Sequence, residues 1–216
     1  MARPKIARKS TNIDMTAMCD VAFLLLSFFI LATQFKPQEA VNVITPNSVS
    51  SDAAPKKDVV MLSITPDGKV FMMMDNTDKK ITVLDELNDR RKLGWSADDV
   101  KRIAALPFFG TSASNLKAAL QLPADKYNGQ TLPGLPAQDT ANSELKDWMY
   151  AVNTAHQGGK INLLLKGDMN SKYPAFKHVI DAFKANDLLK FKMVTNPENV
   201  PTDSELFRTG RRKSDQ

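Results

Sequence analysis

The chain has 216 residues, of which 43% are hydrophobic and 25% are charged. This length suits one membrane anchor with one modest domain, or a domain enlarged by an insertion. The formal net charge is +5, but much of the excess lies at the two ends, without interleaved aromatic residues or a nucleic-acid motif, so no nucleic acid is expected as a partner. Cys19 is the only cysteine, which excludes an intramolecular disulfide and a cysteine-based metal site.

The first predicted element is an apolar helix near the N-terminus. Residues 15–35 carry one formal charge, at Asp20, and as a helix they span about 31 Å, close to the roughly 30 Å of a bilayer core. The uninterrupted apolar part, 21–32, is shorter, so hydropathy alone also allows a signal peptide or a buried helix. The acid just before this run and the absence of an A-x-A site after it favour an uncleaved span. We therefore predict a transmembrane helix at 14–35.

The charges beside this span predict its orientation. The arm 1–13 has four basic residues and no acid, which is typical of a cytoplasmic segment. The rest of the chain is then expected outside the inner membrane, in the periplasm. It is divided into a Pro-rich linker (36–57), a domain (58–198) and a flexible basic tail (199–216).

Polar side chains of the predicted span lie along one side. On a 3.6-residue helix, Thr16, Asp20, Ser27 and Gln34 fall within about 40° of one line. This polar stripe is expected to face another helix or a wet cavity. An ionisable residue inside a membrane is a candidate for an ion pathway. The alternative places Asp20 at the cytoplasmic interface, solvated and without function.

The outer domain begins with a linker and a hairpin. Within the linker, residues 41–44 form an apolar patch that is a candidate for adding a strand to a neighbouring sheet edge. Residues 59–64 and 69–74 flank the turn signal Thr-Pro-Asp-Gly, which predicts a β-hairpin. The three methionines at 72–74 are interpreted as strand core rather than as a soft-metal site.

The C-terminal part of the domain predicts a strand, a helix and a strand. Residues 161–168 form a nearly continuous apolar run, typical of a strand covered on both faces. Residues 171–187 predict a helix, and 190–195 alternate like a final strand that Pro197 ends. The apolar face of that helix consists of Phe176, Val179, Ile180 and Phe183. The fold class is therefore α+β.

The middle of the domain is expected to be helical, with one long loop. Residues 81–93 and 144–156 predict helices, and so do residues 96–106, where Ser96 is the expected N-cap. Residues 122–139 are rich in Pro and Gly and predict a loop.

No catalytic pattern is present. His156 and His178 lie far apart in the sequence, with no carboxylate at metal-ligand spacing. No nucleophile elbow, phosphate loop, dinucleotide fingerprint or zinc pattern occurs. We therefore predict neither an enzyme nor a metal site nor a cofactor. Residues 110–115 are interpreted as a loop or a helix cap.

The residues around the span resemble the start of the ExbD/TolR family. The stretch NIDMTAMCDVAFLLLSFFIL is similar to the family pattern Asn-x-Thr-Pro-x-x-Asp before an apolar span. Thr16 keeps the Thr, Asp14 and Ala17 replace the Asn and the Pro, and Asp20 falls on the proton-carrying Asp of the family. The similarity extends over about 10–75 and 158–198. Relative to this family, about 93–140 is an insertion.

The resemblance implies a motor subunit of the inner membrane. Asp20 would carry protons in a cavity formed with an ExbB/TolQ-like polytopic membrane protein, and Thr16 and Ser27 would offer it hydrogen bonds. Two copies, a homodimer, are expected inside a ring of that partner, in contact with membrane lipid. The periplasmic domain would act on a TonB-like protein to energise transport across the outer membrane. Two alternatives remain: a TolR-like subunit for envelope maintenance, and a signal-anchored periplasmic scaffold or binding module.

Overall fold

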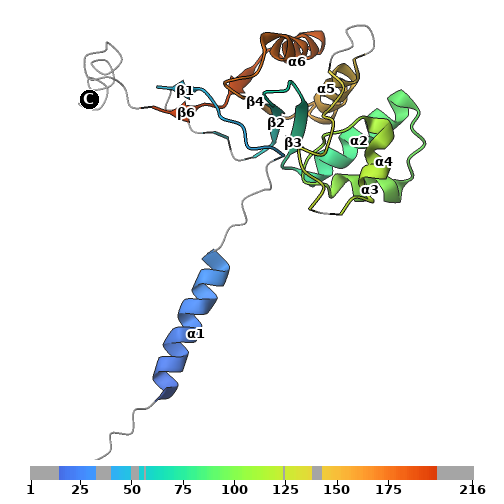
Figure 1. Cartoon of the computed structure of the whole chain (residues 1–216). Helices are drawn as coiled ribbons and strands as arrows, with labels where there is room; N and C mark the ends of the chain where they lie inside the picture. The colour runs from blue at the N-terminus through green and yellow to red at the C-terminus, as the bar shows by residue number, and fades with distance from the viewer. Residues whose placement is uncertain are drawn as a thin grey trace, which may run out of the picture. The chain divides into compact units, whose positions relative to one another are not determined.

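The computed structural model describes residues 15–32, 40–49, 54–55, 57–123, 125–137 and 143–198. The chain divides into two units, one up to Pro37 and one from Gln38 onward. The first contains helix α1 (Met15–Ala32) and the second contains the α+β domain (Figure 1). The predicted arm, the predicted tail, Gln34 and part of the predicted linker lie outside the described residues.

The domain is built on a four-stranded sheet in the order β3-β2-β4-β5. Strands β2 (Val59–Ile64) and β3 (Val70–Met74) form the predicted antiparallel hairpin. Gly68 in its turn has a φ of 80°, a left-handed conformation that favours glycine. Strands β4 (Asn162–Gly167) and β5 (Phe191–Met193) continue the sheet in parallel register with β2. The predicted strand–helix–strand unit is therefore confirmed.

The helices begin where polar caps satisfy their first amide groups. Helix α2 (Thr77–Arg91) starts one turn earlier than predicted, because the Asn76 side chain accepts hydrogen bonds from the amides of Asp78 and Lys79. Ser96 caps helix α3 (Ala97–Ala104) as predicted, and Asp99 returns the bond in a capping box. The remaining helical segments are η1 (Ala113–Asn115), α4 (Leu116–Ala119), α5 (Glu144–Ala155) and α6 (Tyr173–Ala185).

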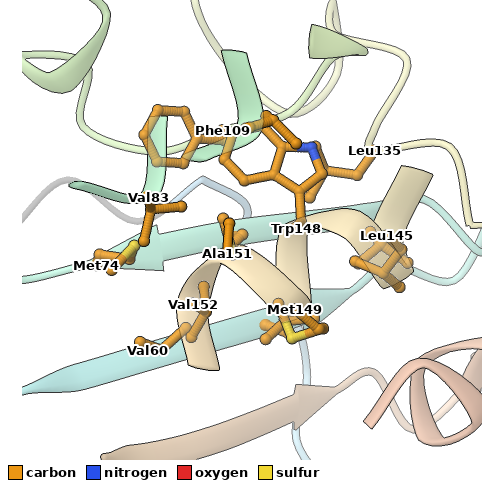
Figure 2. Close-up of a cluster of buried hydrophobic side chains, with 14 of the residues drawn as sticks. Val60, Met74, Val83, Phe109, Leu135, Leu145, Trp148, Met149, Ala151 and Val152 are labelled. Carbon is orange, nitrogen blue, oxygen red and sulfur yellow. The ribbon is translucent and has the colours of Figure 1, made fainter. Parts of the chain in front are cut away.

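The main core lies between one face of the sheet and the helices. Alternate residues of the strands, such as Leu62, Met72 and Leu165, are fully buried on this face. From helix α5, Trp148 reaches toward Phe109, and the two ring centroids are 5.0 Å apart (Figure 2). Met72 and Met74 belong to this core, in agreement with the interpretation of the methionines as strand core. Most of the predicted apolar face of α6 also packs here, through buried Val179 and Phe183 and partly buried Phe176, whereas Ile180 is partly buried but does not belong to this core.

The 93–137 segment is an integral part of the domain. Its residues Trp95, Ile103, Phe109 and Leu116 are buried in the main core. The Met72 and Phe109 backbones exchange two hydrogen bonds, of 2.9 and 2.7 Å, and the Leu135 amide donates to the Val70 carbonyl at 2.7 Å. These contacts pair the outer edge of β3, which would otherwise be an open edge.

The same segment covers part of the other sheet face. Phe71 points away from the main core and packs in a second cluster. The buried members of this cluster are Phe71, Phe108, Ala119, Tyr127 and Leu132, and Ala40 and Val41 pack against them.

The segment that enters the domain, residues 40–48, differs from the prediction. Residues 41–44, the candidate for adding a strand to a sheet edge, form no strand within this chain, and β1 (Asn47–Ser48) pairs in parallel with β6 (Asn196–Pro197). At Ile44 the amide donates to the Asp168 carboxylate and the carbonyl accepts from the Met169 amide, both at 2.8 Å. The prediction that Pro197 ends the last strand is also wrong. Pro197 lies in β6, a two-residue strand in a separate two-stranded sheet, where its missing amide is tolerated.

We predict that Phe109→Ala strongly destabilises the domain. The substitution removes a fully buried ring that packs on Trp148, and such truncations cost about 3–5 kcal/mol. Chemical denaturation followed by tryptophan fluorescence measures the loss. Leu189→Ala is the control, because Leu189 is 64% exposed and its truncation should change the free energy of unfolding by less than about 0.5 kcal/mol. Equal stability of the two variants would show that the 93–137 segment does not support the core.

Candidate functional site

Helix α1 places three predicted residues on one face. It is continuous from Met15 to Ala32, so Thr16 lies one turn before Asp20 and Ser27 about two turns after it. The Ser27 hydroxyl donates to the Leu24 carbonyl at 2.9 Å. Ser27 stands about 10 Å from Asp20 along the helix axis, so within one helix it does not reach the carboxylate. Of these two hydroxyl residues, only Thr16 is close enough to Asp20 along α1 to reach its carboxylate.

The surface of α1 is apolar and uncovered. Its 18 residues have a mean hydropathy of 2.2, and none of them is buried within the chain. The helix is about 27 Å long, close to the bilayer core thickness of roughly 30 Å. A core helix of a soluble protein would be buried, whereas a signal sequence near the N-terminus would share these properties. Length and composition alone therefore leave span and signal sequence open.

Comparison with protein families decides between a membrane span and a signal sequence. The chain matches the family described as Biopolymer transport protein ExbD/TolR over residues 7–198. The chain belongs to the ExbD/TolR family. Comparisons with curated proteins and with solved structures give no significant match.

The family match includes both α1 and the α+β domain. The match runs from before α1 to the end of the described domain, so α1 and the domain belong to one family unit. This ExbD/TolR protein is a single-pass membrane protein and an energy-transduction subunit of biopolymer transport. The family consists of non-enzymatic, transport-associated proteins that work with ExbB/TolQ-type partners.

The α+β domain contains a buried carboxylate that the sequence did not predict. Glu144 is 6% exposed, and its Oε1 accepts hydrogen bonds from the Ala113 amide at 2.6 Å and from Trp148 Nε1 at 3.2 Å. Arg91 Nη1 lies 3.8 Å from Glu144 Oε2, and Arg91 Nη2 lies 2.7 Å from Asp147 Oδ2. These contacts join α2, α5 and η1, so the cluster fixes the 93–137 segment to the helices.

A second buried carboxylate holds the entry segment. Asp168 is 4% exposed at the carboxyl end of β4. Its Oδ2 accepts from the Ile44 amide at 2.8 Å and its Oδ1 from the Asn170 amide at 2.9 Å. No sequence pattern identifies this contact, because Ile44 and Asp168 are 124 positions apart.

The two histidines lie on different helices. His156 is buried at the end of α5, with Nδ1 2.8 Å from the Val152 carbonyl oxygen. His178 is partly exposed on α6. Among the residues that the structure describes, no three His, Cys, Asp or Glu side chains are grouped to hold a metal ion.

Burial lowers the pKa of His156, and the neighbouring Lys79 lowers it further. The hydrogen bond to Val152 and the carboxylates of Asp58 and Asp75 act in the opposite direction but do not prevail. The unfolded chain, in which His has a pKa of about 6.5, therefore binds a proton more readily than the folded domain. The resulting stability is present above about pH 6.5 and is lost as the pH falls below it.

We predict that the domain is less stable at about pH 5 than at about pH 7.5, and that His156→Gln flattens this dependence. The slope due to one histidine is at most about 1.4 kcal/mol per pH unit. Denaturant unfolding at both pH values measures it, and His178→Gln serves as the control. An unchanged pH dependence in His156→Gln would contradict this assignment.

Proposed function

We propose that this protein is a proton-channel subunit of an inner-membrane motor of the ExbB–ExbD type, which uses the proton-motive force to energise TonB-dependent transport across the outer membrane. The observation that carries the proposal is the position of Asp20. It is the single formal charge of a helix whose other surface is apolar and uncovered. A carboxylate in such a helix requires a partner of its own inside the membrane.

The proposed chemistry is reversible protonation of the Asp20 carboxylate. The carboxylate takes a proton from the periplasmic side and later releases it toward the cytoplasm. Each proton that crosses delivers roughly 2.3 kcal/mol per 100 mV of membrane potential, which is enough to bias a conformational cycle. Thr16 lies within reach of the carboxylate along the same helix. Because Ser27 stands about 10 Å away, it would serve a carboxylate on a neighbouring helix or line the proton path beyond Asp20.

The proposed partners follow from the two sides of α1. The polar stripe packs against an ExbB/TolQ-like polytopic membrane protein, which encloses a proton path, and two copies of this chain share that partner. The remaining apolar surface of α1 suits neighbouring helices or membrane lipid. With the basic arm in the cytoplasm, the α+β domain lies in the periplasm, where it passes motion to a TonB-like protein.

We predict that Asp20→Asn abolishes energised uptake without loss of the protein. Asparagine has nearly the same size as aspartate but does not ionise, so the proton path is interrupted while the helix is retained. Uptake through an outer-membrane receptor is measured in cells that lack the chromosomal copy, together with membrane level and co-purification of the polytopic partner. Uptake should fall to the level of cells without the protein.

Asp20→Glu is the matched control, because it keeps an ionisable carboxyl and should retain more uptake than Asp20→Asn. Normal uptake in Asp20→Asn would refute the motor proposal and favour the anchored scaffold. A deletion strain that is sensitive to detergent but retains uptake would instead favour the TolR-like role in envelope maintenance.

A further inference from the structure

The chain enters the outer domain against a loop of the 93–137 segment. The Gly129 amide donates a hydrogen bond to the Ala40 carbonyl at 3.0 Å. Ala40 and Val41 also pack against the second hydrophobic cluster, which includes Tyr127 and Leu132. This contact joins residues almost ninety positions apart, and one side of it belongs to the segment that we predicted as an insertion.

The contact requires a glycine at position 129. A Cβ atom at Gly129 would lie 2.1 Å from Val41 Cγ2 and 2.8 Å from the Ala40 carbonyl oxygen. Both distances are below the closest approach of real Cβ atoms, and one of the two obstructing atoms belongs to the backbone. Any larger side chain at position 129 therefore displaces residues 40–41 or the loop.

The 127–132 loop is held in place without the entry segment. Tyr127 donates its hydroxyl to the Phe108 carbonyl at 2.6 Å, and the two rings are 4.9 Å apart. Asn128 Oδ1 accepts from the amides of Gln130 and Thr131, at 3.1 and 3.0 Å. Lys69 Nζ, from the β2–β3 hairpin, donates to two carbonyls of the loop at 3.3 and 3.1 Å. These contacts hold the loop in place independently of residues 40–41, which pack on it.

We propose that the 127–132 loop is a clamp that holds Ala40 and Val41 on the domain. The clamp fixes the end of the tether, by which we mean the chain from Ala32 to Ala40. With the clamp closed, the tether from Ala32 to Ala40 has a contour of at most about 28 Å. Without the clamp, the next contact along the chain is that of the Ile44 amide with Asp168, and the limit from Ala32 would be about 42 Å. The clamp therefore shortens the reach of the tether by about a third. Its consequence for force transmission rests on the proposed function, but the clamp itself does not.

A single thiol tests the clamp in the full-length protein in its membrane. With Cys19→Ser removing the native thiol, Val41→Cys places a thiol where residue 41 packs against the second hydrophobic cluster. A mass-tagged maleimide should label this thiol slowly. Adding Gly129→Ala, whose Cβ obstructs residues 40–41, should make the labelling several-fold faster.

The control adds Gly159→Ala to Val41→Cys instead, because a Cβ at Gly159 meets no atom closer than 3.7 Å. Its labelling should stay as slow as that of Val41→Cys alone. Equal labelling rates with Gly129→Ala and with Gly159→Ala would overturn the proposal.

Hydrogen exchange tests the same clamp without new thiols. Gly129→Ala should remove protection from the amide of residue 129, which donates to the Ala40 carbonyl, while β4 stays protected and shows that the domain is folded. Gly159→Ala is the matched control, because a Cβ there meets nothing closer than 3.7 Å. Retained protection of the residue 129 amide in Gly129→Ala would contradict the clamp. Neither experiment depends on transport, so a failed clamp is distinguishable from a failure of the motor proposal in the Asp20→Asn test.

Discussion

The α+β domain depends on the closure of its sheet at β3. A sheet of four strands leaves two edges and two faces to be covered, and a single row of helices covers only one face. The backbone pairs of Met72 with Phe109 and of Val70 with Leu135 close the β3 edge, and Phe71 and Phe108 extend the cover to the second face. The domain therefore has two hydrophobic clusters with β3 between them, and the 93–137 segment contributes to both.

Buried polar groups fix that segment more specifically than apolar contacts would. Lys80, which is 7% exposed on α2, donates to the Leu106 carbonyl at 3.1 Å, and burial lowers its pKa. Glu144 on α5 accepts from the Ala113 amide. A buried donor or acceptor without its partner costs about 1–3 kcal/mol, and a charged group costs more. Each bond therefore penalises any arrangement in which the 93–137 segment moves away from the two helices.

The sequence predicted most elements of the fold because their signals are local. The Thr-Pro-Asp-Gly turn, the Ser96 cap and the apolar face of α6 are all formed by residues near one another in the chain, and the structure confirms them. The first strand, β1, was not predicted, because its pairing with β6 joins residues that lie far apart in the chain. The role of 93–137 in the core was also missed. Its pairing with β3 is made by backbone groups, which leave no trace in residue type.

The candidate site could be predicted for the same reason. Thr16, Asp20 and Ser27 lie within four turns of one helix, so periodicity alone places them on one face. Ser27 shows the limit of this reasoning, because angular proximity on a helix says nothing of distance along its axis. Helical periodicity also does not predict the surface that faces Asp20, because that surface belongs to another molecule in the proposed motor.

The two units of the chain differ in how they satisfy their ionisable groups. In the α+β domain, Asp168 accepts hydrogen bonds from backbone amides, and Glu144 accepts them from an amide and an indole, so both buried acids have hydrogen-bond donors within the chain. Helix α1 offers Asp20 no cover, because no residue of α1 is buried. A carboxylate in an apolar helix that its own chain does not enclose must be stabilised by water, by lipid headgroups or by a partner. Nine large apolar side chains of α1 from Val21 onward are exposed as well, and they need the same partner or lipid. A polytopic protein that packs against the polar stripe satisfies both requirements, and for this reason the proposed motor places the proton path between α1 and its partner.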